Sequence, residues 1–179
     1  MFPFKVLLIA VSAGLALALG IAVWLAPSEQ TQTLQTVFQA QPGTVFAVVS
    51  NNRDWRYRTS LDDLRILETD EHGWEVWEER SQGRTIRFTT QAKEPPSFYA
   101  LTMQGEGFSG RWQARFEPLP GGRTRYTATE HIIVFDGTFM RIMGWCCMDL
   151  AGYMRTYQED VRRKLGERPG AVATDASHG

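Results

Sequence analysis

The stretch GRWQARFEPLPGGRTRYTATEHIIVF, residues 110–135, contains two runs of alternating residues joined by a Pro-Gly-Gly turn. Polar residues occupy every second position of each run. The other face carries Trp112, Ala114, Phe116, Tyr126, Ala128, Glu130 and Ile132. Alternation with a period of two predicts antiparallel strands that are covered on one face and wet on the other. We therefore expect strands over 110–119 and 123–135.

The segment that follows has a helical period and supplies a cover for this sheet face. Apolar residues recur at spacings of three and four, at Phe139, Met143, Cys146, Leu150, Tyr153, Met154, Tyr157 and Val161. Such spacing places them on one stripe of a helix. The pattern predicts a long helix from Gly137 to Leu165, ended by Gly166.

The segments before residue 110 complete the expected architecture. The sequence PGTVFAVVSN, residues 42–51, predicts one short helix with Pro42 at its first position. Runs rich in β-branched and aromatic residues, separated by turn residues, predict further strands at Thr33–Ala40, Leu61–Asp70, Trp74–Arg80, Arg84–Lys93 and Ser97–Gln104. A short helix, a series of strands and a long helix indicate an α+β domain over 33–166.

The N-terminal residues 1–26 predict a membrane anchor. Val6–Ala26 contains no charged residue, and its 21 residues would form a helix of about 31 Å, close to the thickness of a bilayer core. A cleaved signal peptide is the alternative, although its apolar region would be shorter. A polar linker is expected at 27–32, and the small, polar tail at 167–179 is expected to be disordered.

The charges beside this apolar run predict its orientation. Lys5 precedes it, and no lysine or arginine occurs between Ala26 and Arg53. The positive-inside rule then places the N-terminus in the cytoplasm and the domain outside it. Small residues at every fourth position are compatible with self-association of the span: Ala10, Gly14, Ala18 and Ala22.

Several functional classes find no support in the sequence. A formal charge of −1 gives no drive toward nucleic acid. Cys146 and Cys147 are adjacent in the predicted helix, too close for an unstrained disulfide, and no further ligands for zinc are near them. His72, His131 and His178 form no pair that suggests a metal site. The glycines of GEGFSG, residues 105–110, precede a strand rather than a helix, so they indicate a hairpin and not a nucleotide site. We expect no cofactor.

Two segments resemble the SRPBCC superfamily, the helix-grip fold of START domains, polyketide cyclases and birch-pollen-type allergens. GRWQARFEPLPGGRTRYTATEH is similar to the family's late hairpin, and FMRIMGWCCMDLAGYMRTYQEDVRRKLGE is similar to its closing helix. The resemblance implies a curved sheet of about six to seven antiparallel strands around that helix, with an apolar cavity between them. It also implies binding of lipophilic molecules, which a minority of members convert chemically.

These features predict a membrane-anchored domain that binds a lipophilic small molecule or lipid. The residues expected to line the cavity are Trp112, Ala114, Phe116, Tyr126, Ala128, Glu130, Ile132, Met143, Cys146, Leu150, Tyr153, Met154 and Tyr157. Glu130, a carboxyl group on an apolar face, is expected at the polar end. Two alternatives remain open. One is a cyclase-type enzyme using Glu130, Tyr126 and Tyr153, and the other is an interaction module with a filled core.

Overall fold

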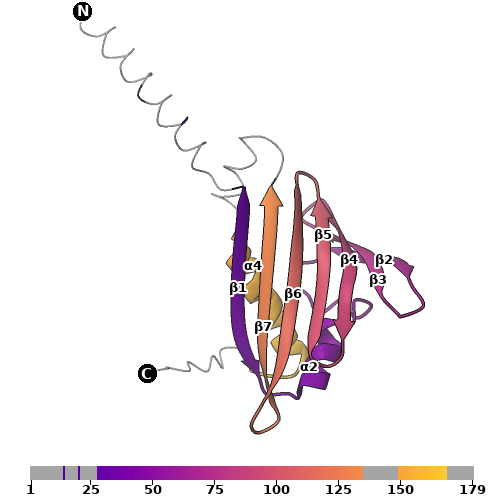
Figure 1. Ribbon diagram of the computed structural model, residues 1–179, viewed down its shortest axis with the longest axis vertical. Coiled ribbons are helices and arrows are strands. Elements are labelled where there is room, and N and C mark those ends of the chain that lie inside the picture. Colours follow the sequence, from indigo (N-terminus) through magenta and orange to yellow (C-terminus); the bar gives the residue numbers. More distant parts are fainter. Residues whose placement is uncertain (1–13, 15–19, 21–27, 135–148, 169–179) are drawn as a thin grey trace, which may run out of the picture.

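The computed structural model of the chain describes Gly14, Gly20 and residues 28–134 and 149–168 (Figure 1). A sheet curves around one helix, and a second, shorter helix lies at the end of the sheet. The described elements are, in chain order, β1 (Glu29–Phe38), α2 (Pro42–Val49), β2 (Asp63–Thr69), β3 (Glu75–Ser81), β4 (Arg84–Glu94), β5 (Phe98–Gly105), β6 (Phe108–Leu119), β7 (Arg123–Val134) and α4 (Leu150–Lys164).

The seven strands form one antiparallel sheet in the order β1-β7-β6-β5-β4-β3-β2. Strands β2 to β7 follow one another as a meander, and β1 joins the sheet beside β7. The predicted α+β class, with about six to seven antiparallel strands and a C-terminal helix, is therefore confirmed.

The β6–β7 hairpin has the register that the alternation predicted. Phe116 lies opposite Tyr126, and Trp112 lies opposite Glu130. All seven predicted apolar-face positions consequently share one face of the sheet, the inner face, which α4 covers. At the turn, Gly122 has a φ of +71°, a left-handed conformation that glycine adopts without steric cost.

The glycines of residues 105–110 serve the β5–β6 hairpin, as predicted. Gly107 occupies its turn with a φ of +79°. Gly110 lies on the inner face, where a Cβ atom would stand 2.8 Å from the carbonyl oxygen of His131. This position thus requires a residue without a side chain.

Helix α4 begins later than the sequence predicted. The Asp149 carboxylate accepts a hydrogen bond from the Gly152 amide at 2.7 Å, and its ψ of 75° is not helical. The expectation of one unbroken helix from Gly137 to Leu165 is therefore wrong at Asp149, because this residue satisfies a free amide as an N-cap. Residues 137–148 lie outside the described part of the chain. At the other end, the basic residues Arg162, Arg163 and Lys164 oppose the negative end of the helix dipole.

The core lies between the inner face, α4 and α2. Phe46 of α2 packs its ring edge against Phe116 and Tyr99, with centroids 5.2 and 6.4 Å apart. Leu150, Met154 and Val161 of α4 are buried on the same core. The short helix predicted at 42–51 is thus confirmed, two residues shorter, and its apolar side closes one end of the sheet.

The domain is longer at both ends than the predicted 33–166. Strand β1 begins at Glu29, so residues 29–32 of the expected linker form part of the sheet. The run EQTQ carries no apolar residue because it belongs to an edge strand, so hydrophobicity did not reveal it. At the C-terminus, Glu167 is held by Arg162 at 2.8 Å and accepts from the Gln39 amide at 2.6 Å. The expectation of a disordered tail is wrong for this residue, and 169–179 lie outside the described residues.

The predicted membrane span lies outside the described residues except for Gly14 and Gly20. Among the helices that the structure describes, none has both the length and the apolar composition needed to cross a membrane. The orientation and self-association expected for residues 6–26 remain predictions.

Candidate ligand-binding site

The predicted site residues on the sheet come together on the inner face. Ala114 and Ala128 lie opposite each other, and both of these small side chains are buried. Phe116 and Tyr126 pack edge to face with centroids 5.3 Å apart. Trp112 packs in the same way on Tyr99, at 5.9 Å. Ile132 is buried at the far end of this apolar wall.

The predicted residues of the last helix divide into three groups. Leu150 and Met154 are buried on the core, and Tyr157 packs against it. Tyr153 is 51% exposed, which corrects its expected place in the cavity. On a helix, Tyr153 is displaced by about 80° from the centre of the stripe that Leu150, Met154 and Val161 define, so its ring projects at the edge. Met143 and Cys146 lie outside the described residues, as does Cys147.

A buried ion pair lies in this core, and the sequence did not reveal it. Arg58 comes from the irregular segment between α2 and β2, and its two amino groups bind the carboxylate of Glu79 on β3, with Nη2–Oε2 at 2.8 Å. Trp77 also donates from its indole nitrogen to Glu79 at 3.0 Å. The guanidinium group stands over the Tyr157 ring, 5.1 Å from its centroid. The ion pair thus links β3 to the covering helix.

Three tyrosines surround this ion pair. The Tyr57 hydroxyl donates to the carbonyl of Val48 at 3.4 Å. Burial raises the pKa of Tyr57, and it raises the pKa of Tyr126 and Tyr157 well above the usual value. All three hydroxyls therefore stay protonated at neutral pH and can donate a hydrogen bond.

Glu130 is a further carboxyl group of the inner face. It lies on β7 between Trp112 on β6 and Gln32 on β1, and its side chain is half-buried. Burial, followed by the negative charge of Glu79, raises the pKa of Glu130 to about 7. Within the described residues, Glu130 forms no hydrogen bond or ion pair. Its predicted place on the inner face is confirmed by the register.

Four buried polar side-chain atoms have no hydrogen-bond partner among the described residues. They are the Tyr126 hydroxyl, the Gln158 amide nitrogen and the Nε atoms of Arg58 and Arg162, and Arg162 lies apart from Arg58, at the end of α4 beside β1. A buried donor left unpaired costs about 1–3 kcal/mol, so native proteins rarely keep several together. A polar group of a bound molecule, or ordered water, would satisfy them.

Part of this polar cluster could have been predicted from the sequence of β3. On β3, Glu75, Trp77 and Glu79 alternate on one face, so two acidic residues accompany a tryptophan that belongs in a core. Arg58 had no such signal, because the segment before β2 has no periodicity. Its burial is set by the tertiary contact with Glu79.

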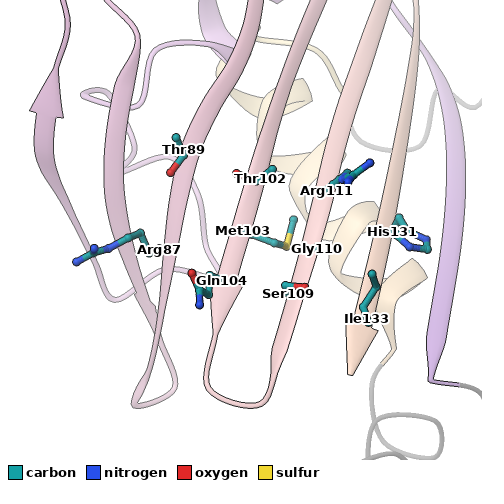
Figure 2. Close-up of a pocket in the computed structure, with 10 residues that line it drawn as sticks. All are labelled: Arg87, Thr89, Thr102, Met103, Gln104, Ser109, Gly110, Arg111, His131 and Ile133. Atoms are coloured by element: carbon teal, nitrogen blue, oxygen red, sulfur yellow. The ribbon is translucent and has the colours of Figure 1, made fainter. Parts of the chain in front are cut away.

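The outer face of the sheet carries shallow hollows of a different character. One, of about 310 Å³, is lined mainly by polar side chains, including Arg87, Thr102, Gln104, Ser109, Arg111 and His131 (Figure 2). His131 forms a hydrogen bond with the Thr31 hydroxyl at 2.8 Å. It lies on the solvent-exposed face of the sheet, as the alternation predicted. Among the described residues, no group of three or more histidine, cysteine or acidic side chains could hold a metal ion.

The inner face therefore has apolar walls with a polar cluster at one place. Apolar walls favour a lipophilic body, and a few convergent polar groups fix its orientation. Glu130 can also give or take a proton near neutral pH, whereas Glu79 is held by Arg58 and Trp77.

Comparison with known proteins agrees with this architecture. The family described as polyketide cyclase / dehydrase and lipid transport matches residues 30–165. No curated protein matches the chain.

Solved structures with the same fold share little sequence with the chain. Truncated norcoclaurine synthase from Thalictrum flavum superimposes with a TM-score of 0.62 at 10% identity, covering 78% of this chain and 95% of that one. The ZhuI aromatase/cyclase from a Streptomyces species superimposes with a TM-score of 0.58 at 13% identity, covering 78% of this chain and 99% of that one. The di-domain aromatase/cyclase BexL superimposes with a TM-score of 0.64 at 13% identity, covering 83% of this chain and 54% of that one. These similarities concern the fold alone. The family of the chain is identified by the family match, which spans most of its length. The chain belongs to the polyketide cyclase / dehydrase and lipid transport family of the SRPBCC superfamily.

Proposed function

We propose that the domain binds a lipophilic small molecule or lipid between the inner face of the sheet and helix α4. The observation that carries the proposal is the set of buried, unpartnered polar atoms at Tyr126, Gln158 and Arg58 within an otherwise apolar wall. A core that only stabilises the fold would gain from apolar residues at these positions. The family's association with lipid transport and polyketide cyclisation supports a hydrophobic ligand.

The proposal includes attachment of the domain to a membrane. Residues 6–26 are apolar and long enough to cross a bilayer, and Lys5 favours a cytoplasmic N-terminus. A tethered binding domain would take up its ligand from the same bilayer or deliver it there. The domain would then act outside the cytoplasm, and the small residues of the span would permit self-association.

A cyclase-type enzyme is the second candidate, and one observation favours it. Glu130 has a pKa of about 7, so both its acid and its base form are populated at neutral pH. The protonated Tyr126 hydroxyl lies on the same strand face as a second donor. Tyr153 is exposed, so this hypothesis now rests on Glu130 and Tyr126. An enzyme would convert the bound molecule during incubation and lose that conversion in Glu130→Gln, whereas a binder would return the molecule unchanged.

The binding proposal is tested by filling the inner face. Ala128 is buried on the inner face, so in Ala128→Phe the added ring would occupy the space proposed for the ligand. We expect at least about tenfold weaker binding of N-octyl dansylamide, a neutral lipophilic probe that accepts energy from nearby tryptophans. The measurement is energy transfer to the probe in the full chain, reconstituted in phosphatidylcholine nanodiscs.

The matched control is Ala100→Phe, which adds the same ring to the outer face of β5. It should bind the probe as the wild type does. Should Ala128→Phe fail to fold, Leu34→Trp fills the inner face from the opposite residue on β1, where the side chain is half-buried. Equal probe binding by all folded variants would place the probe elsewhere and contradict the proposed site, and absence of binding to the wild type would support the filled interaction module.

The membrane arrangement predicts the behaviour of fusions at the C-terminus. If residues 6–26 are retained as a span with a cytoplasmic N-terminus, alkaline phosphatase fused after Gly179 will be active in a bacterial host. A fluorescent protein that folds only in the cytoplasm will be dark at the same site. The reverse pattern would contradict the proposed orientation.

A further inference from the structure

The inner face carries three carboxylates, and their partners differ. Glu79 is bound by Arg58. Glu75 is bound by Arg53 at 3.0 Å and by Asn52 at 3.1 Å. Glu130 has no cation within hydrogen-bonding or ion-pairing distance among the described residues. When Glu130 is ionised, the cluster around Arg58 therefore carries one uncompensated negative charge.

The groups around Glu130 offer no competing positive charge. From the neighbouring strands come Gln32 and Trp112, which are neutral. From β3 comes the negative Glu79, and on its own strand lies the neutral Tyr126. Arg58 is the nearby cation from the covering segment, but both its amino groups are engaged by Glu79.

The position of Glu130 suits a cation that arrives with a ligand. The side chains of Glu130 and Trp112 both lie on the inner face by the strand register and are half-buried, so part of each remains accessible. Residues directly opposite on adjacent strands have Cβ atoms about 4.5–5.5 Å apart. An ammonium group beside the carboxylate would consequently lie within reach of the indole face, which attracts cations.

We infer that the site prefers lipophiles bearing a basic amine, whose ammonium group binds between the Glu130 carboxylate, the Gln32 side chain and the Trp112 ring. This inference rests on the proposed lipophile-binding function. A ligand carboxylate at the same place would put a second negative charge beside Glu130 in a poorly solvated site and would be disfavoured. A neutral alcohol would form a hydrogen bond there without charge compensation.

Displacement of N-octyl dansylamide by three octyl compounds tests the preference. Octylamine, octanol and octanoate share one chain and differ in the head group. For the full chain in phosphatidylcholine nanodiscs at about pH 8, we expect octylamine to displace the probe at least about tenfold more tightly than octanol, with octanoate weakest. Glu130→Gln should abolish the advantage of the amine and leave octanol unchanged.

The matched control is Glu117→Gln, which neutralises an exposed acid on the outer face of β6 and should keep the preference. In the wild type alone, octylamine affinity should fall as the pH is lowered from about 8 to about 6, because Glu130 becomes protonated, while octanol affinity stays level. This second measurement holds even if Glu130→Gln does not fold. Equal displacement by the three compounds, or an amine preference that survives Glu130→Gln, would overturn the inference and leave lipophile binding intact. Failure of the probe itself to bind would overturn both.

Discussion

Replacing Arg162 by alanine is expected to lower the free energy of unfolding by about 3–5 kcal/mol, the cost of removing one partner from a buried ion pair. Arg162 is 1% exposed at the end of α4. Its guanidinium group binds Glu167 and Thr36, each at 2.8 Å, and stands over the ring of Phe38 at 5.3 Å. Without it, the largely buried Glu167 carboxylate would keep the Gln39 amide but lose its cationic partner, and α4 would lose its hydrogen bond to Thr36 of β1.

The matched control is Arg155→Ala on the same helix. Arg155 is exposed, and its contact with Asp149 spans 3.7 Å, so the change should cost less than about 1 kcal/mol. Chemical denaturation followed by circular dichroism measures both variants. A loss below about 1 kcal/mol for Arg162→Ala would show that α4 is not held to β1 by this residue.

The stability of the domain should depend on pH through Glu130. Its pKa is raised from an ordinary value of 4.5 to about 7, so the folded state binds this proton more tightly than the unfolded state does. The protonated carboxyl therefore contributes to the free energy of unfolding. This contribution is complete below about pH 4.5 and is lost as the pH rises through 7. Across this window the loss amounts to about 3 kcal/mol.

Glu130→Gln should remove this pH dependence of the free energy of unfolding, because glutamine resembles the protonated acid. We expect the variant to match the wild type near pH 4.5 and to be more stable by about 3 kcal/mol near pH 8. Glu117→Gln, with its exposed carboxylate, should follow the wild type at both pH values. The difference in unfolding free energy between variant and wild type isolates Glu130 from the other carboxylates. A difference that does not change with pH would contradict the environment assigned to this group.

The sheet face was predictable because its signal is local. Period-two alternation in residues 110–135 determines which side chains share a face, and the hairpin turn determines their register. The predicted bounds of β2 to β5 agree with the structure to within two residues, the ordinary uncertainty of element boundaries. The start of β1 was missed because an edge strand needs no apolar residue where solvent covers it. The start of α4 was not predictable from spacing, because the helical period continues through Asp149 although aspartate is a strong N-cap.

The site was predictable only in its apolar part. Glu130 stood out because a carboxyl group interrupted an apolar face. The Arg58–Glu79 pair could not be predicted, because its members are 21 residues apart and Arg58 comes from an irregular segment. Likewise, the exposure of Tyr153 depends on the exact rotation of α4, which spacing alone leaves undetermined over a broad apolar stripe.

The most direct test of the account is whether the protein carries a lipophile in its interior. The full chain and its Ala128→Phe and Ala100→Phe variants would be purified in the same non-ionic detergent and examined by native mass spectrometry, followed by extraction of the bound molecules. We predict that the wild type and Ala100→Phe retain a lipophilic molecule that Ala128→Phe lacks. Equal occupancy of the three proteins, or none in any of them, would contradict a ligand site between the sheet and α4.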